Sequence, residues 1–460
     1  MDQSLRFDAG LIRKYDQSGP RYTSYPTAVQ FHEGFGEAQY RDWAARSNRA
    51  GNPLSLYFHL PFCDTVCFYC ACNKVVTKDR SKAEPYLRRL YREMEMQAAL
   101  FDHDRPVAQL HWGGGTPTFI SHEQMRELMA FTREQFRLAD DDSGEYSIEV
   151  DPREADAETI ALLREIGFNR LSMGVQDFDP RVQKAVNRIQ PQEQTLAVLQ
   201  AARAEGFRSI SMDLIYGLPF QSVASFGATV DKIIDSGPDR LSVFNYAHLP
   251  ERFKPQRRIN AEELPLPAEK LDILHNTIER LTAAGYVYIG MDHFARPDDE
   301  LAVAQREGSL YRNFQGYSTH AECDLIGLGI TSVGKVGDCY AQNLRGLDEY
   351  YARIDAGRLA VFRGVELDAD DLLRREVITQ LICHFGLDYA AIQQGFGIRF
   401  ADYFAEELSR LAGMRDDGLV ELDAAGIRVL PAGRLLIRNV CMVFDRYLKR
   451  ESAQRYSRVI

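Results

Sequence analysis

From residue 54 onward, short apolar runs alternate with longer segments in which apolar residues recur every three or four positions. Runs such as PLSLYFHLPF predict buried strands, and segments such as KAEPYLRRLYREMEMQAALF have the period of a helix. The predicted strands lie within residues 53–62, 106–119, 145–154, 169–178, 209–219 and 239–250. The predicted helices that follow them lie within residues 82–101, 121–136, 155–167, 192–206, 222–237 and 267–285.

Six strand–helix units in succession predict an α/β fold with parallel strands and right-handed crossovers. This pattern fits either a barrel, whole or partial, or an open doubly wound sheet. In both architectures ligands gather at the carboxyl ends of the strands. Glu149, Gln176, Asp213 and the tail of FNYAHLP fall at such ends, so they are candidate ligand-binding positions.

The two ends of the chain depart from this alternation. The stretch KYDQSGPRYTSYPTA, within the first fifty residues, is polar and aromatic and has no helical period, which predicts an arm that packs on another part of the protein. Residues 400–448 show a helix, a short hairpin and a helix, which predict a small, mainly helical domain of winged-helix type. The predicted domains are therefore an arm (1–50), a catalytic α/β domain (51–365) and a carboxyl-terminal domain (366–460).

Composition and charge argue against several classes of binding protein. The chain has 460 residues, is 45% hydrophobic and carries a formal net charge of −11, which argues against general binding to nucleic acid or to an anionic membrane. Residues 366–460 hold 13 Lys and Arg against 15 Asp and Glu, so the alternative of a winged-helix transcription factor is disfavoured.

No apolar run reaches the roughly 18 residues of a membrane span, and the first residues lack the apolar core of a secretory signal. We therefore expect no membrane span and a cytoplasmic location. In a reducing compartment, clustered cysteines are better explained as metal ligands than as disulfides.

Four of the eight cysteines fall within PFCDTVCFYCACN, residues 61–73. Cys63, Cys67 and Cys70 form C-x-x-x-C-x-x-C, and Cys72 follows two residues later. A structural zinc site is the alternative, but zinc sites usually take two ligand pairs separated by a longer loop. A 4Fe–4S cluster is larger and can be held from one side by a short loop, and three thiolates leave its fourth iron open for another ligand.

This motif, with Tyr69 just before its third cysteine, resembles that of the radical S-adenosylmethionine (SAM) enzymes. Nearly the whole chain resembles one family of that superfamily, the oxygen-independent coproporphyrinogen III oxidases. The similar segments are GPRYTSYPTA, YFHLPFC, CNKVVT, HWGGGTPT, SIEVDPRE, NRLSMGVQDF, MDLIYGLP, LSVFNYAHLP, MDHFARPDDELA, RNFQGYSTH and RLLIRN. The resemblance implies a partial (β/α)6 TIM-like barrel with an amino-terminal arm and a winged-helix-like carboxyl-terminal domain.

The resemblance also implies the cofactors: a 4Fe–4S cluster on Cys63, Cys67 and Cys70, and two SAM molecules. Cys72 matches an extra family cysteine that is not a cluster ligand, with a role either in loop packing or in catalysis. The implied cofactor contacts are Tyr57, Tyr69, Gly114, Gly115, Thr116, Glu149, Gln176, Arg188, Asp213, Ala247 and Val333. The implied active-site residues are Tyr57, Phe314 and Gln315.

The activity implied by the resemblance is the oxidative decarboxylation of two propionates of coproporphyrinogen III to vinyl groups through a 5′-deoxyadenosyl radical. The product is protoporphyrinogen IX, in haem biosynthesis. A low-potential donor such as flavodoxin or ferredoxin is expected to supply electrons to a monomeric enzyme. The alternative is a related radical SAM haem-trafficking protein or methyltransferase, but such relatives generally lack RNFQGY and the GPRYTSYPTA arm.

Because the substrate is strongly anionic and the chain is acidic, attraction between them must be local. The arm carries Arg13, Lys14 and Arg21 among tyrosines. Arginine pairs bidentately with carboxylates, and tyrosine rings can lie against a pyrrole face. We therefore expect the arm to close over the substrate, with a static strap on the outside of the barrel as the alternative.

Overall fold

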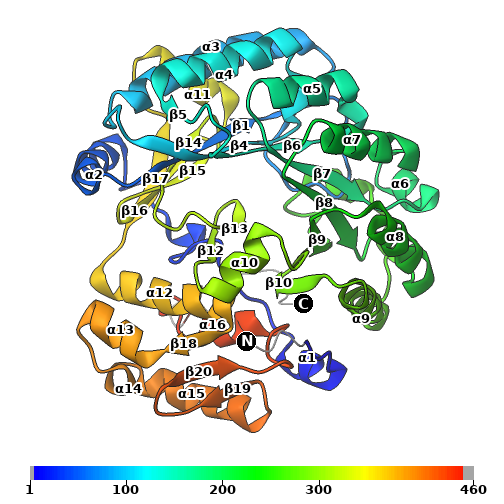
Figure 1. Ribbon diagram of the computed structural model, residues 1–460, viewed down its shortest axis with the longest axis vertical. Helices are drawn as coiled ribbons and strands as arrows, with labels where there is room; N and C mark the ends of the chain where they lie inside the picture. Colours follow the sequence, from blue (N-terminus) through cyan, green and yellow to red (C-terminus); the bar gives the residue numbers. More distant parts are fainter. Residues whose placement is uncertain (1–4, 449–460) are drawn as a thin grey trace. The chain divides into compact units, whose positions relative to one another are not determined.

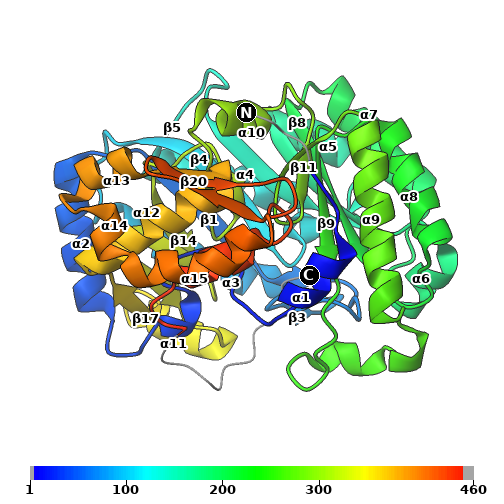
Figure 2. The same cartoon turned by 90° about the horizontal axis from the view of Figure 1, so that it is seen from below.

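The computed structural model describes residues 5–448; the outermost ends of the predicted arm (1–4) and of the predicted carboxyl-terminal domain (449–460) lie outside the described residues. By its internal contacts the chain divides into two units (Figures 1 and 2). The barrel unit consists of residues 30–270 and 322–366, and the helical unit consists of residues 1–29, 271–321 and 367–460. This division has a boundary beside the predicted one at residue 365, but it places residues 30–50 in the barrel unit and residues 271–321 in the helical unit. The three predicted domains stay a prediction.

The barrel unit is built on the six predicted strands, and all six are confirmed. They are β1 (Leu54–Leu60), β4 (Pro106–Gly114), β6 (Glu145–Val150), β7 (Arg170–Gln176), β8 (Ser209–Tyr216) and β9 (Arg240–Asn245). They lie in the order β9-β8-β7-β6-β4-β1, and every neighbouring pair is parallel. Their carboxyl ends therefore meet at one edge, as a partial barrel requires.

Further strands, which the apolar pattern did not predict, extend this sheet beyond β1. They are β14 (Asp324–Leu328), parallel to β1, followed by the antiparallel β15 (Val333–Val336), β16 (Cys339–Asn343) and β17 (Val361–Glu366). Short β5 (Arg137–Leu138) pairs with β4, and β2 (Phe62–Cys63) pairs with β3 (Val75–Val76).

Helices cover the outer face of the sheet in the barrel unit (Figure 1). They are α2 (Glu37–Ala50), α3 (Ala83–Ala98), α4 (His122–Gln135), α5 (Ala157–Glu165), α6 (Pro180–Ala185), α7 (Gln192–Ala204), α8 (Val223–Ser236) and α11 (Leu347–Asp355). The 3-10 turns are η1 (Ala28–Gln30), η2 (Arg80–Lys82), η3 (Pro117–Phe119), η4 (Pro152–Glu154), η5 (Lys254–Arg258) and η6 (Ala261–Glu263). Side-chain caps begin several of these helices: Ser121 accepts a hydrogen bond from the backbone of Gln124, and Asp156 accepts one from that of Thr159.

The core between sheet and helices is aromatic and aliphatic. Trp112 on β4 is fully buried and packs edge-on against Phe168, with ring centroids 4.9 Å apart. A buried carboxylate, Glu93 on α3, also lies there and accepts hydrogen bonds from Tyr350 and Asn343. Buried polar groups persist in such a core only when they are hydrogen-bonded, so these contacts fix how α3 lies against the sheet.

The helical unit contains the predicted helix, hairpin and helix: α15 (Ala405–Asp416), β19 (Val420–Leu422) with β20 (Gly426–Val429), and α16 (Ile437–Val443). Strand β18 (Gly386–Asp388) completes an antiparallel sheet in the order β18-β20-β19. Its other elements are α1 (Ala9–Tyr15), β10 (Val287–Gly290), β11 (His293–Ala295), α10 (Glu300–Glu307), β12 (Tyr311–Asn313), β13 (Gly316–Ser318), α12 (Ala369–His384), α13 (Tyr389–Phe396) and α14 (Phe400–Tyr403). Helix α9 (Pro267–Ala283) begins in one unit and ends in the other.

Two helices, α1 and α2, lie on either side of the polar and aromatic stretch in the first fifty residues, and caps define their ends. Asp8 accepts hydrogen bonds from the backbone of Gly10 and Leu11 and so begins α1. Gly51, with a φ of +66°, ends α2 in the left-handed conformation that glycine adopts without strain. The stretch KYDQSGPRYTSYPTA itself contains only the end of α1 and the beginning of η1, as expected from its lack of a helical period.

The arm is anchored within the helical unit. Lys14 Nζ lies 2.7 Å from Asp417 Oδ1, and Arg21 Nη1 lies 3.1 Å from Asp292 Oδ2. Two of the three cations expected to attract the substrate are thus paired with carboxylates of the protein. This removes the main reason for expecting the arm to close over an anion, and it favours the strap.

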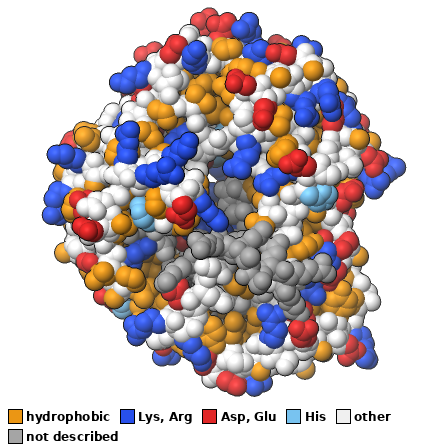
Figure 3. Space-filling view, turned by 180° about the vertical axis from the view of Figure 1, so that it is seen from behind, with side chains coloured by type: hydrophobic (Ala, Val, Ile, Leu, Met, Phe, Trp, Pro, Cys, Tyr) orange, Lys and Arg blue, Asp and Glu red, His pale blue; other side chains and the backbone are white. Residues whose placement is uncertain are grey.

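Basic and acidic side chains are interspersed with hydrophobic ones on the face drawn in Figure 3. Within residues 5–448, no helix combines the length and the apolar character that crossing a membrane requires.

Candidate functional site

At the carboxyl-end edge of the parallel strands, the barrel unit has a cavity of about 320 Å³. Most of the residues predicted to bind cofactors line it: Cys63, Cys67, Cys70, Tyr69, Gly114, Gly115, Thr116, Glu149, Gln176, Arg188 and Asp213. Tyr57, Ala247 and Val333 also belong to the barrel unit but do not line this cavity, and Phe314 and Gln315 belong to the helical unit. The parallel sheet thus brings together residues that are up to 150 positions apart in the sequence.

The cysteine loop leaves β1 and is closed at its base by the pairing of β2 with β3, where Phe62 lies opposite Val75. Cys63, Cys67 and Cys70 all line the cavity, and they come from one short loop and not from two pairs separated by a longer loop. This arrangement suits a 4Fe–4S cluster, which a short loop can hold from one side, better than a single zinc ion.

Hydrogen-bond donors surround the thiols of this loop. Arg153 Nη2 lies 3.5 Å from Cys67 Sγ, and Arg188 Nη1 lies 3.6 Å from the same atom. The hydroxyl of Thr116 lies 3.7 Å from Cys63 Sγ. Donors directed at sulfur stabilise thiolate character and tune the potential of a bound cluster, so the residues present fit an iron–sulfur group.

Asp151 holds both of these arginines in place. Its Oδ2 lies 2.9 Å from Arg188 Nη1 and 2.7 Å from Arg153 Nη2. Burial alone would raise the pKa of Asp151, but the two guanidinium groups outweigh burial and hold that pKa below its usual value. Asp151 and Arg153 were not among the predicted residues, although they stand in VDPRE directly after Glu149.

The Gly-rich turn after β4 brings backbone to the cavity wall. A Cβ on Gly115 would lie 2.6 Å from the carbonyl oxygen of Phe62, and Gly114 has a φ of +114°. Only glycine fits these two positions without strain. The Gly114 N–H donates to Glu149 Oε2 over 3.1 Å, so the turn and the end of β6 are joined at the cavity.

Glu149 and Asp213 are two strand-end carboxylates that line the cavity, and their pKa values move in opposite directions. Burial would raise the pKa of Glu149, but the hydrogen bond and charge of His111 and the Gly114 N–H lower it below its usual value. For Asp213, burial dominates, and the nearby charge of Glu149 adds to it, so its pKa rises to about 6. Ser172 Oγ donates to Asp213 over 3.3 Å and opposes this rise only in part.

Gln176 ends β7 in a strained conformation. Its φ of +69° is in the left-handed region, which is uncommon for a residue other than glycine. Its Oε1 is buried and has no hydrogen-bond partner among the described residues. Backbone strain together with an unsatisfied hydrogen-bond acceptor at a cavity is typical of a residue that binds a ligand.

Tyr57 reaches the cavity only through another side chain. Its ring stacks on His111 with centroids 5.8 Å apart, and its hydroxyl lies 3.1 Å from His59 Nδ1. His111 Nε2 in turn lies 3.4 Å from Glu149 Oε1. Tyr57 therefore supports the wall of the cavity on the side of Glu149.

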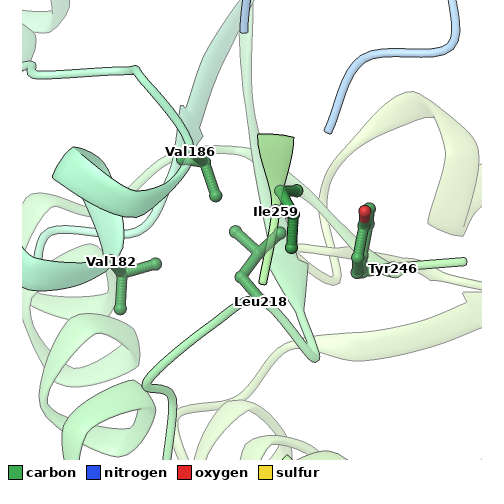
Figure 4. Packing of buried hydrophobic residues seen from close by; sticks show 5 residues of the cluster. All are labelled: Val182, Val186, Leu218, Tyr246 and Ile259. Atoms are coloured by element: carbon green, nitrogen blue, oxygen red, sulfur yellow. The ribbon is translucent and has the colours of Figure 1, made fainter. Parts of the chain in front are cut away.

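The far side of the cysteine loop rests on a hydrophobic cluster formed by Val182, Val186, Leu218, Tyr246 and Ile259 (Figure 4). Phe68 and Tyr69, between the second and third cysteines, pack against this cluster. The loop is thus supported by packing behind it, while its thiols face the cavity.

Comparisons with known proteins agree with this geometry. Residues 57–233 match the radical SAM superfamily, and residues 367–436 match the HemN C-terminal domain. The chain is 58% identical over its whole length to all of an oxygen-independent coproporphyrinogen III oxidase from Pseudomonas aeruginosa. It is 53% identical to the protein of that name from Escherichia coli, over 100% of this chain and 99% of the relative. A solved structure of coproporphyrinogen III oxidase from Escherichia coli, described as a radical SAM enzyme, aligns with a TM-score of 0.92 at 52% identity, over 96% of this chain and 100% of that one.

Proposed function

The chain belongs to the family of oxygen-independent coproporphyrinogen III oxidases, and from this premise we propose that it decarboxylates two propionates of coproporphyrinogen III oxidatively to vinyl groups in haem biosynthesis. The observation that carries the proposal is the convergence of the cysteine loop, the glycine turn and the strand-end carboxylates on one cavity. Full-length similarity to oxidases favours this activity over the alternative of a haem-trafficking protein or methyltransferase.

In this proposal Cys63, Cys67 and Cys70 would hold a 4Fe–4S cluster, and three protein ligands would leave it able to bind SAM. When bound, the cluster would supply one electron to SAM, and SAM would supply the group that abstracts a hydrogen atom from the substrate. The protein orients them: Arg153 and Arg188 donate to the loop thiols, and the packing behind the loop keeps it rigid.

The strand-end residues bind SAM. Glu149 is ionised, so it can accept hydrogen bonds from the ammonium of SAM near the backbone of Gly114. Asp213 is suited to accept from a ribose hydroxyl or the ammonium, and the unsatisfied Oε1 of Gln176 is a further acceptor. Arg188, already paired with Asp151, keeps its role beside the cluster and offers charge to the SAM carboxylate.

The finer roles rest on family resemblance alone. We propose that two SAM molecules bind, with Tyr57, Tyr69, Ala247 and Val333 completing their contacts. We also propose that Tyr57, Phe314 and Gln315 act at the substrate. The enzyme is proposed to work as a cytoplasmic monomer that accepts electrons from flavodoxin or ferredoxin.

The test is anaerobic reconstitution with iron and sulfide, followed by incubation with SAM, dithionite and coproporphyrinogen III. Protoporphyrinogen IX and methionine are the expected products. Cys63→Ala should lose the broad visible absorption of the cluster and all activity, whereas the matched variant Cys72→Ala should keep the cluster. Full iron content in Cys63→Ala would refute the ligand assignment, and a reconstituted wild type that cleaves SAM but leaves the substrate intact would refute the function.

A further inference from the structure

One exposed segment beside the cysteine loop stands out by its charge. The run ERFKPQRR, residues 251–258, carries four cationic side chains (Arg252, Lys254, Arg257 and Arg258) and one acidic side chain, and all five residues are exposed. The whole chain has a net charge of −11, and charges of both signs are mixed on the face in Figure 3. A concentrated positive segment on an acidic protein produces a local field that attracts an acidic partner.

Buried contacts hold this segment against the cysteine loop. Gln256 is 2% exposed, and its Nε2 donates to the carbonyl oxygen of Tyr69 over 3.0 Å. Its Oε1 accepts from the backbone N–H of Leu249 over 2.6 Å. The guanidinium of Arg258 lies over the ring of Phe68, 5.2 Å from its centroid. Phe68 and Tyr69 are the two residues between Cys67 and Cys70, so the segment that carries the cations is held against the loop of the proposed cluster ligands.

A second exposed segment reaches the same loop. The backbone N–H of Phe68 donates to the carbonyl oxygen of Val186 over 2.9 Å. Lys184 and Ile189, on either side of Val186 in the sequence, are both exposed, and Ile189 is 67% exposed. Val186 packs in the same cluster as Ile259, which directly follows the basic segment (Figure 4). The surface thus combines cations with an exposed apolar side chain, which is typical of a small transient interface.

We propose that this surface, formed by residues 251–258 with Lys184 and Ile189, docks an acidic one-electron carrier protein that reduces the cluster. The inference rests on the proposed function, which requires an electron to enter the cluster from outside. In the docked complex the carrier loses one electron and the cluster gains it, with no bond made or broken. Nucleic acid would also be attracted by cations, but it carries no electron, and the acidic chain as a whole repels it.

Charge reversal of the reconstituted holoenzyme tests this docking. In Arg252→Glu/Lys254→Glu/Arg257→Glu, the second-order rate of cluster reduction by reduced flavodoxin, followed anaerobically by stopped flow at low salt, should fall about tenfold or more. The salt dependence of that rate should also weaken. Reduced ferredoxin, a second acidic carrier, is tested in parallel, and a fall with either carrier supports the docking surface.

The matched control is Arg49→Glu/Arg88→Glu/Arg92→Glu, which makes the same change of charge at exposed positions on α2 and α3. It should change the reduction rates less than twofold. Dithionite needs no docking surface, so dithionite-driven SAM cleavage should be equal in both variants and the wild type. Rates with both carriers within twofold of the control variant would overturn the proposal, whereas failure of dithionite-driven cleavage in the wild type would overturn the proposed function instead.

Discussion

At the scale of single residues, the surroundings of two carboxylates in the site shift their pKa values in opposite directions. Glu149 lines the cavity with 47% of its side-chain surface exposed and lies beside His111, so it stays ionised. Asp213 has a pKa of about 6, because burial and the charge of Glu149 both disfavour its anion. The apoprotein therefore keeps a destabilised negative charge at this position, which a cationic or hydroxyl-bearing ligand would relieve.

Asp213→Asn should accordingly stabilise the fold and weaken SAM binding. A raised carboxyl pKa lowers stability above that pKa, so at pH 8 we expect the free energy of unfolding to rise by about 1–2 kcal/mol. The affinity for SAM should fall by about 1.5–3 kcal/mol, because a charged acceptor is lost. Urea unfolding and isothermal titration under anaerobic conditions measure the two effects.

Asp235→Asn, at an exposed position on α8, is the control and should change neither quantity. Wild-type affinity for SAM should also fall as the pH drops through about 6, where Asp213 takes up a proton. Unchanged SAM affinity in Asp213→Asn would show that the carboxylate does not contact the cofactor.

At the scale of elements, three segments of the barrel unit meet at one buried carboxylate. Glu93 on α3 accepts from Gly329 N–H, Tyr350 Oη and Asn343 Nδ2, each over 2.7 Å. Tyr350 comes from α11, Asn343 ends β16, and Gly329 follows β14. Burial still raises the pKa of Glu93 to about 7 despite these three donors.

Two substitutions of Glu93 should distinguish how much its hydrogen bonds and its charge each contribute to the free energy of unfolding. Glu93→Ala leaves three buried donors without an acceptor and should lower the free energy of unfolding by about 3 kcal/mol or more. Glu93→Gln should cost less, and its cost should shrink as the pH rises from 5 to 8. The sign follows from the raised pKa: the folded state holds the Glu93 proton that the unfolded state has lost, so wild-type stability falls as pH rises from about 4.5 to 7.

Urea unfolding at pH 5, 6, 7 and 8 measures this dependence, with exposed Glu95→Gln on the same helix as control. We expect the difference between Glu93→Gln and wild type to change by about 1–3 kcal/mol over that range. A difference that is the same at every pH would mean that Glu93 does not titrate there.

The elements also show which parts of the fold a sequence can predict. The six parallel strands and their helices follow from apolar period, because each strand is buried by helices and each helix has one apolar face. Strands β14–β17 have four to six residues and mixed polarity, so their pairing depends on neighbours that are distant in the sequence. The cysteine loop and the strand-end carboxylates are predictable, whereas Asp151 and Arg153 look like solvated residues until the fold brings Arg188 and Cys67 to them.

At the scale of the whole molecule, the assignment of segments to units could not be derived from local pattern. Residues 271–321 belong with the carboxyl-terminal part, and residues 30–50 belong with the barrel. Both assignments depend on contacts between distant segments. The arm also depends on contacts between segments that are distant in the sequence. Arg438, which is 3% exposed, donates through Nε to the carbonyl oxygen of Pro20 over 2.9 Å.

Deleting residues 1–28 should therefore destabilise the helical unit and leave the cluster site folded. Tyr22 and Tyr25 are 3% and 2% exposed, and the Tyr22 hydroxyl donates to Asp445 over 3.0 Å. Loss of these rings and of the acceptor for Arg438 should lower stability by several kcal/mol.

Thermal unfolding of the reconstituted truncated protein by circular dichroism should show an early transition, while the visible absorption of the cluster persists through it. Within the full chain, Tyr22→Ala should lower the midpoint of that transition strongly, and Tyr22→Phe, which keeps the ring, should lower it only slightly. That result would show that the buried ring contributes more to anchoring the arm than the hydroxyl does. If the truncated protein unfolds at the wild-type temperature and only decarboxylation is lost, the arm acts on the substrate and not as a strap.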